Sequence, residues 1–148
     1  ELIETLPTTR KEHLVSSKAL IEKLRCLGHE VFCAMEEVKW SRSNFDSPSS
    51  ALQIDWTRIN DADHVIACPS IDRYVSGGVH IEIGWAIALG IPLTILSQME
   101  LMSKTTMLAG FATAPDFDAK IIYYETSFLE AEKEICLRLS KSTTCQAG

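Results

Sequence analysis

Apolar residues recur at helical spacing in some segments of the chain and form short, continuous runs in others. This pattern predicts helices that alternate with strands. From about Glu12 to Leu27 the apolar residues recur at helical spacing, and Gly28 suits the end of that helix. Four short runs are β-rich or continuously apolar and predict buried strands: Glu30–Met35, His64–Cys68, Ile91–Leu96 and Lys120–Tyr124.

The segments between and after these runs predict further helices. Ser47 suits an N-cap, and Pro48 suits the first turn of a helix that reaches to about Asp63. Two more helices are predicted at Val79–Leu89, closed by Gly90, and at Ser127–Leu139, and the Met-rich segment Gln98–Gly110 is expected to be partly helical. This alternation predicts βαβ units, so we expect an α/β fold with a parallel sheet and helices on both faces.

Neither a repeat nor a linker divides the chain. Residues 1–148 are therefore expected to form one domain, with a flexible tail at 140–148. In parallel α/β sheets, ligands bind beyond the carboxyl ends of the strands. The loop Pro69–Gly78 follows the predicted strand His64–Cys68, which places it at that functional edge.

Composition and charge limit the kinds of molecule that we expect this protein to bind. The 148 residues carry a formal net charge of −6, which argues against sequence-independent binding to nucleic acid. Five cysteines stand far apart without a C-x-x-C or zinc spacing, so we expect reduced thiols in a cytoplasmic protein and no bound metal. Because no apolar run reaches the roughly 18 to 20 residues of a membrane span, we expect no membrane partner.

One carboxylate, Glu82, stands in the nearly uncharged stretch Ser76–Gly90, "SGGVHIEIGWAIALG". If Val79 is the N-cap of the predicted helix, Glu82 takes the third helical position, where the helix dipole and a capping box favour a carboxylate. The same position suits chemistry, because an ionised carboxylate in a partly dry cleft can attack a sugar anomeric carbon. Both interpretations stay open here. Asp55 and Asp63 are candidates for a second carboxylate, although Asp63 precedes a strand and so lies at the opposite edge.

The segment from Asp55 to Leu96 resembles the nucleoside 2-deoxyribosyltransferase-like family. The sequence motifs of that family occur here in the same order: Asp55, Ala62-Asp63, Val65–Cys68, Glu82-Ile83-Gly84 and Ala88-Leu89-Gly90-Ile91-Pro92. Within the family, "VHIEIGWA" and the upstream "CAMEEVKWSRSNFDSPSSALQID" look most like the pyrimidine-nucleotide hydrolases that act on CMP and hydroxymethyl-CMP. The resemblance covers roughly residues 12 to 140.

This resemblance implies a Rossmann-like (flavodoxin-like) three-layer α/β/α fold, assembled as a homodimer or a higher homo-oligomer. Relatives begin with a strand and a glycine-containing loop that meets the phosphate, and the expected first strand is not evident in this chain. The implied chemistry is cleavage of an N-glycosidic bond through attack by a glutamate at C1′. It needs neither a metal nor an organic cofactor.

The resemblance also implies roles for individual residues. Glu82 matches the nucleophile, and Asp55 matches the acidic residue that positions it or interacts with the leaving base. Ser76 matches the serine that binds the 5′-phosphate, and Gly78 and Val79 lie where backbone N–H groups assist it. A small donor beside a glycine turn and a helix N-terminus is also a physically reasonable anion site.

We therefore expect an enzyme, an N-glycosidase that hydrolyses the base–sugar bond of a CMP-like pyrimidine nucleoside 5′-monophosphate. Trp40, in a polar loop, is a candidate to stack on the base. Trp56 and Trp85 are instead expected in the core. Two alternatives remain: a nucleoside 2-deoxyribosyltransferase that exchanges bases, and a non-catalytic nucleotide-binding module.

Overall fold

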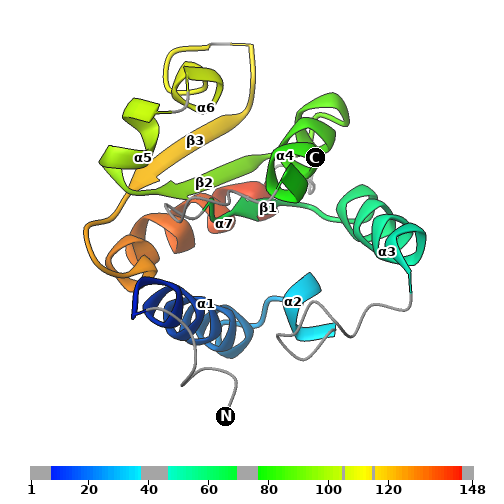
Figure 1. Ribbon diagram of the computed structural model, residues 1–148, viewed down its shortest axis with the longest axis horizontal. Coiled ribbons are helices and arrows are strands. Elements are labelled where there is room, and N and C mark those ends of the chain that lie inside the picture. The colour runs from blue at the N-terminus through cyan, green and yellow to red at the C-terminus, as the bar shows by residue number, and fades with distance from the viewer. Residues whose placement is uncertain (1–7, 38–46, 70–76, 105, 115, 145–148) are drawn as a thin grey trace.

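The computed structural model describes residues 8–37, 47–69, 77–104, 106–114 and 116–144, which form a parallel sheet surrounded by helices (Figure 1). Along the chain the elements are α1 (Thr8–Cys26), α2 (Ala34–Glu37), α3 (Pro48–Asn60), β1 (Val65–Ala67), α4 (Gly77–Ala88), β2 (Leu93–Ser97), α5 (Met99–Lys104), α6 (Thr106–Gly110), β3 (Ala119–Tyr123), the 3-10 helix η2 (Phe128–Ala131) and α7 (Glu132–Thr144). The predicted α/β class is confirmed.

The strands of the sheet are parallel, and β2 lies between β1 and β3. Val65 of β1 lies opposite Leu93 of β2, and Leu93 lies opposite Ala119 of β3. All five residues of β2 are buried, as expected of a central strand covered on both faces. Three of the four strands predicted from apolar runs are therefore present.

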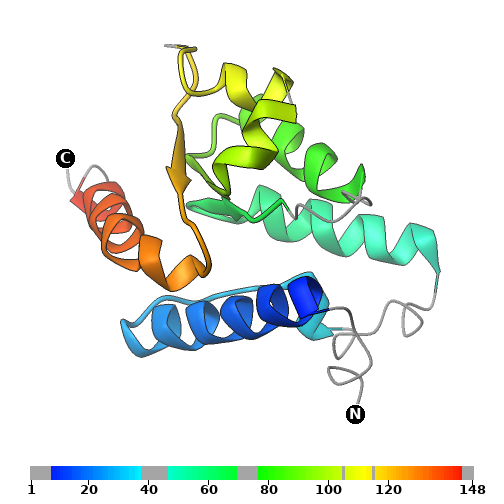
Figure 2. The same cartoon turned by 60° about the vertical axis from the view of Figure 1, so that its left-hand side comes forward.

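Helices cover both faces of the sheet and make three layers (Figures 1 and 2). On one face α1, η2 and α7 pack against β2 and β3 through a cluster that includes Leu24, Leu96 and Phe128. On the other face α4 and α6 pack through a second cluster that includes Ala86 and Ile95. Leu96 and Ile95 belong to opposite clusters because neighbouring side chains of a strand point to opposite faces.

The strand predicted at Glu30–Met35 is wrong. Within the described residues this segment pairs with no strand, and its second half begins the short helix α2. The carbonyl of Val31 accepts a hydrogen bond from Arg25 Nη2 at 2.8 Å, and the Glu36 N–H donates to the Cys33 carbonyl at 2.9 Å. A β-rich composition therefore does not produce a strand where the backbone hydrogen bonds are taken by a side chain and a helical turn.

The predicted start of α3 is confirmed. Ser47 is extended, and its side chain accepts the Ser50 N–H at 3.1 Å, while Pro48 opens the helix. The last helix is longer than predicted, because α7 continues to Thr144 rather than ending at Leu139. Residues 140–144 thus belong to a helix and not to a flexible tail.

Two further observations concern expectations from composition. In the part of the chain that the structure describes, no helix combines the length and apolar character needed to cross a membrane. The described cysteines, Cys26, Cys33, Cys68 and Cys136, form no disulfide with one another.

Candidate active site

The carboxyl ends of the three strands lie at one edge of the sheet, because the strands are parallel. At this edge β1 leads to Cys68 and the buried Pro69, and α4 begins with Gly77. Ile83 and Ala86 anchor α4 to the sheet, at 3% and 0% exposure respectively. Helix α4 therefore holds a fixed position beside the edge where parallel sheets bind ligands.

Glu82 lies deeper in α4 than the sequence predicted. The helix begins at Gly77 rather than Val79, so Glu82 is its sixth residue and no acidic residue stands in its first turn. Because the effect of the helix dipole falls off within the first turn, the predicted capping box and dipole stabilisation are wrong. The structure thus removes the local, helix-start reason for a carboxylate at this position.

Packing between α3 and α4 brings Asp55 and Glu82 together. The rings of Trp56 and Trp85 meet edge to face, with their centroids 5.3 Å apart. Asp55 directly precedes Trp56, and Glu82 lies three residues before Trp85, a spacing that shares a helix face. Both carboxylates are half-buried, and the negative charge of Asp55 acts on Glu82.

Burial raises the pKa of Glu82 above its ordinary value, and the nearby charge of Asp55 raises that pKa further. Burial likewise raises the pKa of Asp55. Within the described residues neither carboxylate has an ion-pair or hydrogen-bond partner. The expectation that the surroundings of Glu82 favour its ionised form is therefore wrong, because both effects favour the protonated acid.

The remaining predicted site residues divide into two groups. Gly78 and Val79 lie in the first turn of α4, where backbone N–H groups have no partner within the helix. Ser76 and Trp40 lie outside the described residues. Gly78 and Val79 thus lie at a helix start as expected, and their role in binding an anion stays a prediction.

Trp56 and Trp85 were both expected in the core, and Trp56 does not lie there. It is 42% exposed, and Trp85 is half-buried beside it. Their edge-to-face contact joins the two helices that carry the carboxylates. The sequence held one signal for this role, because each tryptophan stands within three residues of a candidate carboxylate.

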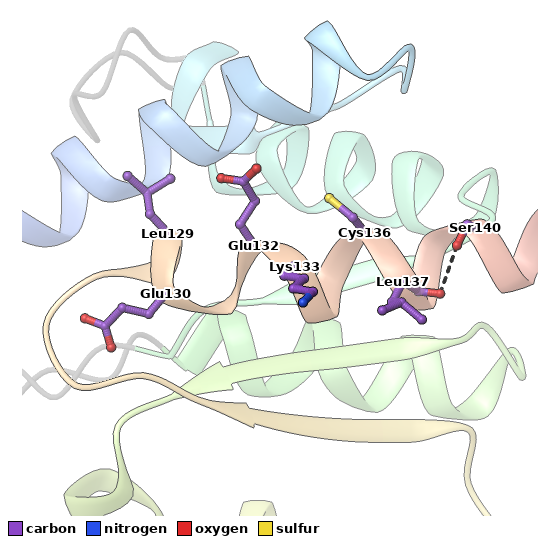
Figure 3. A pocket seen from close by; sticks show the side chains of 7 residues that line it. All are labelled: Leu129, Glu130, Glu132, Lys133, Cys136, Leu137 and Ser140. Carbon is purple, nitrogen blue, oxygen red and sulfur yellow. Dashed lines mark hydrogen bonds between the residues drawn. The ribbon is translucent and has the colours of Figure 1, made fainter.

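An open hollow of about 590 Å³ lies elsewhere, along η2 and α7 between Leu129 and Ser140 (Figure 3). Two exposed leucines, Leu129 and Leu137, share its lining with charged side chains. Neither Asp55 nor Glu82 lines this hollow. It is therefore separate from the paired carboxylates.

Comparison with solved structures finds similar proteins. The solution structure of BlsM matches with a TM-score of 0.73 and 26% sequence identity, over 93% of this chain and 80% of that chain. The structure of the Clostridium botulinum CMP N-glycosidase BcmB matches with a TM-score of 0.58 and 28% identity, over 82% and 90%. No protein-family profile and no curated protein sequence matches the chain.

The fold and the site define a Rossmann-like three-layer α/β/α protein with two half-buried carboxylates beside the carboxyl edge of its sheet. Both structural neighbours are 2-deoxyribosyltransferase-like proteins. The similarity to these two structures supports the resemblance of the chain to the nucleoside 2-deoxyribosyltransferase-like family and to its CMP N-glycosidase branch.

Proposed function

We propose that this protein is an N-glycosidase that hydrolyses the base–sugar bond of a pyrimidine nucleoside 5′-monophosphate, with CMP as the model substrate. One observation carries the proposal: Asp55 and Glu82 share a half-buried position between α3 and α4 without a partner among the described residues. Partial burial of two carboxyl groups without partners does not stabilise the fold, so the pair favours a chemical role. The similarity to the CMP N-glycosidase BcmB supports the choice of substrate class.

In the proposed reaction Glu82 is the nucleophile. A carboxylate oxygen of Glu82 attacks C1′ of the sugar, the C1′–N bond breaks, and its electron pair leaves with the base. Water then attacks C1′ and breaks its bond to Glu82, which releases the sugar phosphate and the free carboxylate, while the proton that the water loses balances the one that the departed base takes up. Asp55 positions Glu82 or meets the departing base. Each step uses only side chains, substrate and water, without an organic cofactor.

The proposed phosphate site is the N-terminus of α4. Its first four N–H groups, from Gly77 to His80, lack acceptors within the helix, and the helix dipole favours an anion there. No acidic residue in the first turn competes with a phosphate for these groups. In the proposal Ser76 adds a hydroxyl to this cradle and Trp40 stacks on the base. These two assignments rest on the family resemblance.

The raised pKa of Glu82 fits the nucleophile of the proposed reaction. A carboxylate of higher pKa is a stronger nucleophile once it is ionised. A partly dry position also limits the water that would compete with substrate for the carboxylate. We place this chemistry in the cytosol, where the expected reduced thiols are stable.

The proposal is tested by incubating the protein with CMP, dCMP and hydroxymethyl-CMP and following free base by chromatography. We expect base release without any added acceptor, and a loss of at least about 1000-fold in Glu82→Ala. Glu134→Ala is the matched control, because Glu134 is an exposed glutamate paired with Lys120 on another part of the surface. Full activity in Glu82→Ala would overturn the proposed mechanism.

The same assay separates the two alternatives. Product that forms only after a second base is added indicates a 2-deoxyribosyltransferase. Binding of nucleotide without turnover of any substrate in the panel indicates a nucleotide-binding module. Either result replaces hydrolysis as the function of this site.

A further inference from the structure

Arg58 is the only lysine or arginine on the two helices that carry the candidate carboxylates. It lies three residues after Asp55 in α3, a spacing at which two side chains are neighbours on the helix surface. An aspartate and an arginine at this spacing can form an ion pair. The sequence of α3 therefore offers Asp55 a cationic partner within its own helix.

The structure directs Arg58 elsewhere. Its guanidinium lies over the Phe32 ring, with the Cζ atom 5.0 Å from the ring centroid, which is within the range of a cation–π contact. No ion pair among the described residues joins Arg58 to a carboxylate. Burial raises the pKa of Asp55, whereas a paired arginine would lower that pKa. Arg58 is thus held by an aromatic ring and not by the neighbouring carboxylate.

Phe32 reaches Arg58 from outside the helix. It is half-buried and belongs to the segment between α1 and α2. Helix α3 therefore has α4 on one side, where Trp56 meets Trp85, and the segment that carries Phe32 on another (Figures 1 and 2). At an exposed site a cation–π contact is generally somewhat stronger than an ion pair at this helical spacing, so the ring can compete with Asp55 for the guanidinium.

We propose that Phe32 is a positioning residue that holds the Arg58 guanidinium away from Asp55, so that Asp55 keeps its negative charge beside Glu82. Without the ring, the exposed Arg58 side chain can turn to rotamers that reach Asp55. The consequence for catalysis rests on the proposed function, because it requires Glu82 to be the nucleophile. The consequence for the charge of the two carboxylates does not.

Few ionisable groups other than these surround the two carboxylates in the described structure. The titratable side chains of α3, α4 and the elements packed against α4, which are α6, β1 and β2, are Asp55, Arg58, His80 and Glu82. The segment that carries Phe32 adds His29, Glu30 and Cys33. Of all these charges, that of Asp55 raises the pKa of Glu82. An ion pair between Asp55 and Arg58 would cancel this effect and lower the pKa of Glu82.

The test follows the titration of the Glu82 carboxyl carbon by NMR in the full chain without substrate, with Glu82→Gln to assign the resonance. Phe32→Leu replaces the ring by an aliphatic side chain and should move the midpoint to lower pH by about 0.5 unit. Phe32→Tyr keeps the ring and should leave the midpoint in place. An unmoved midpoint in folded Phe32→Leu would overturn the proposal.

The double variant F32L/R58Q separates positioning from packing. If Phe32 acts through Arg58, removal of the guanidinium should restore the wild-type midpoint, whereas a general loss of packing would not be reversed. Arg58→Gln alone is the matched control and should titrate like the wild type, because Arg58 has no ion pair with Asp55 there. A midpoint that stays low in F32L/R58Q, or one that moves in Arg58→Gln, would overturn the proposal.

A measurement on the wild type applies even if Phe32→Leu does not fold. The side-chain protons of Arg58 should show an upfield ring-current shift, assigned through their loss in Arg58→Gln, and ordinary chemical shifts would overturn the proposal. These readouts need no substrate, so they are independent of base release. If the midpoint moves in Phe32→Leu while the acid limb of kcat/KM stays in place, the role of Phe32 is supported and Glu82 is not the nucleophile.

Discussion

The two sides of the sheet differ in how their charged groups are used. Around α1, η2 and α7 the charges are paired: Lys23 with Glu132 at 3.2 Å, and Arg138 with Asp118 at 2.6 Å. Glu130 there accepts hydrogen bonds from the Thr126 hydroxyl and three backbone N–H groups, which lower its pKa to about 2. On α3 and α4, by contrast, Asp55 and Glu82 have no partners among the described residues, and the charge of Asp55 acts on Glu82.

The apolar groups differ in the same way. Phe128 of η2 is 1% exposed and meets Tyr124 edge to face, whereas Trp56 of α3 is 42% exposed. The first side satisfies its groups within the chain and stabilises the fold. The second side leaves two carboxylates without partners among the described residues and apolar side chains exposed, as expected of a surface that binds a ligand.

The largest expected effect on stability comes from Phe128→Ala, which should lower the free energy of unfolding by about 3–5 kcal/mol. Phe128 lies in the buried cluster and contacts the rings of both Tyr124 and His13 at centroid distances of 4.8 Å. Denaturant unfolding measures the change. Leu129→Ala is the control, because Leu129 is next to Phe128 in the chain but 43% exposed. This variant should lower the free energy of unfolding by less than about 1 kcal/mol.

Trp56→Ala sharpens the comparison on the other side. This variant should lower the free energy of unfolding by roughly 0.5–1.5 kcal/mol, the contribution of an aromatic pair, when unfolding is measured at low protein concentration. If Trp56→Ala destabilises the chain as much as Phe128→Ala, the two sides do not differ in the way described.

Asp55→Asn should change the dependence of activity on pH rather than the stability of the fold. The charge of Asp55 raises the pKa of Glu82, so its removal should lower that pKa. The acid limb of the pH profile of kcat/KM should therefore move to lower pH, while the maximum falls about 10–100-fold through lost positioning. If the acid limb of this profile stays in place or moves to higher pH, the charge of Asp55 does not act on Glu82 as described. Asp63→Asn, an exposed aspartate beyond α3, is the control and should leave the limb in place.

Much of the fold was predictable from local patterns. Ser47 and Pro48 marked the start of α3, and apolar runs marked β1, β2 and β3, because caps and buried strands depend on neighbouring residues. The prediction of a strand at Glu30–Met35 was wrong because a strand needs a neighbouring strand to pair with, and composition does not reveal one. The predicted position of Glu82 within α4 was wrong because Gly77 and Gly78 belong to the first turn of the helix, although glycine is a poor helix former.

The sequence could nominate the two carboxylates of the candidate site, but it could not predict their electrostatics. Asp55 and Glu82 could be selected through the family resemblance, but the sequence left the placement of Asp55 undecided. Their pairing depends on how α3 packs against α4 through Trp56 and Trp85, a contact between residues 29 positions apart that no local pattern contains. The raised pKa of Glu82 follows from that packing and so could not be predicted beforehand.

The most direct test of the central claim, that Glu82 is kept for chemistry rather than for stability, is the thermal unfolding of Glu82→Gln at neutral pH beside its base release. A carboxyl group whose pKa is raised by folding contributes stability at low pH and loses it as the pH rises through that pKa. Removing the charge should therefore raise the melting temperature by roughly 2–4 °C while base release is lost. A lower melting temperature together with retained base release would contradict the account.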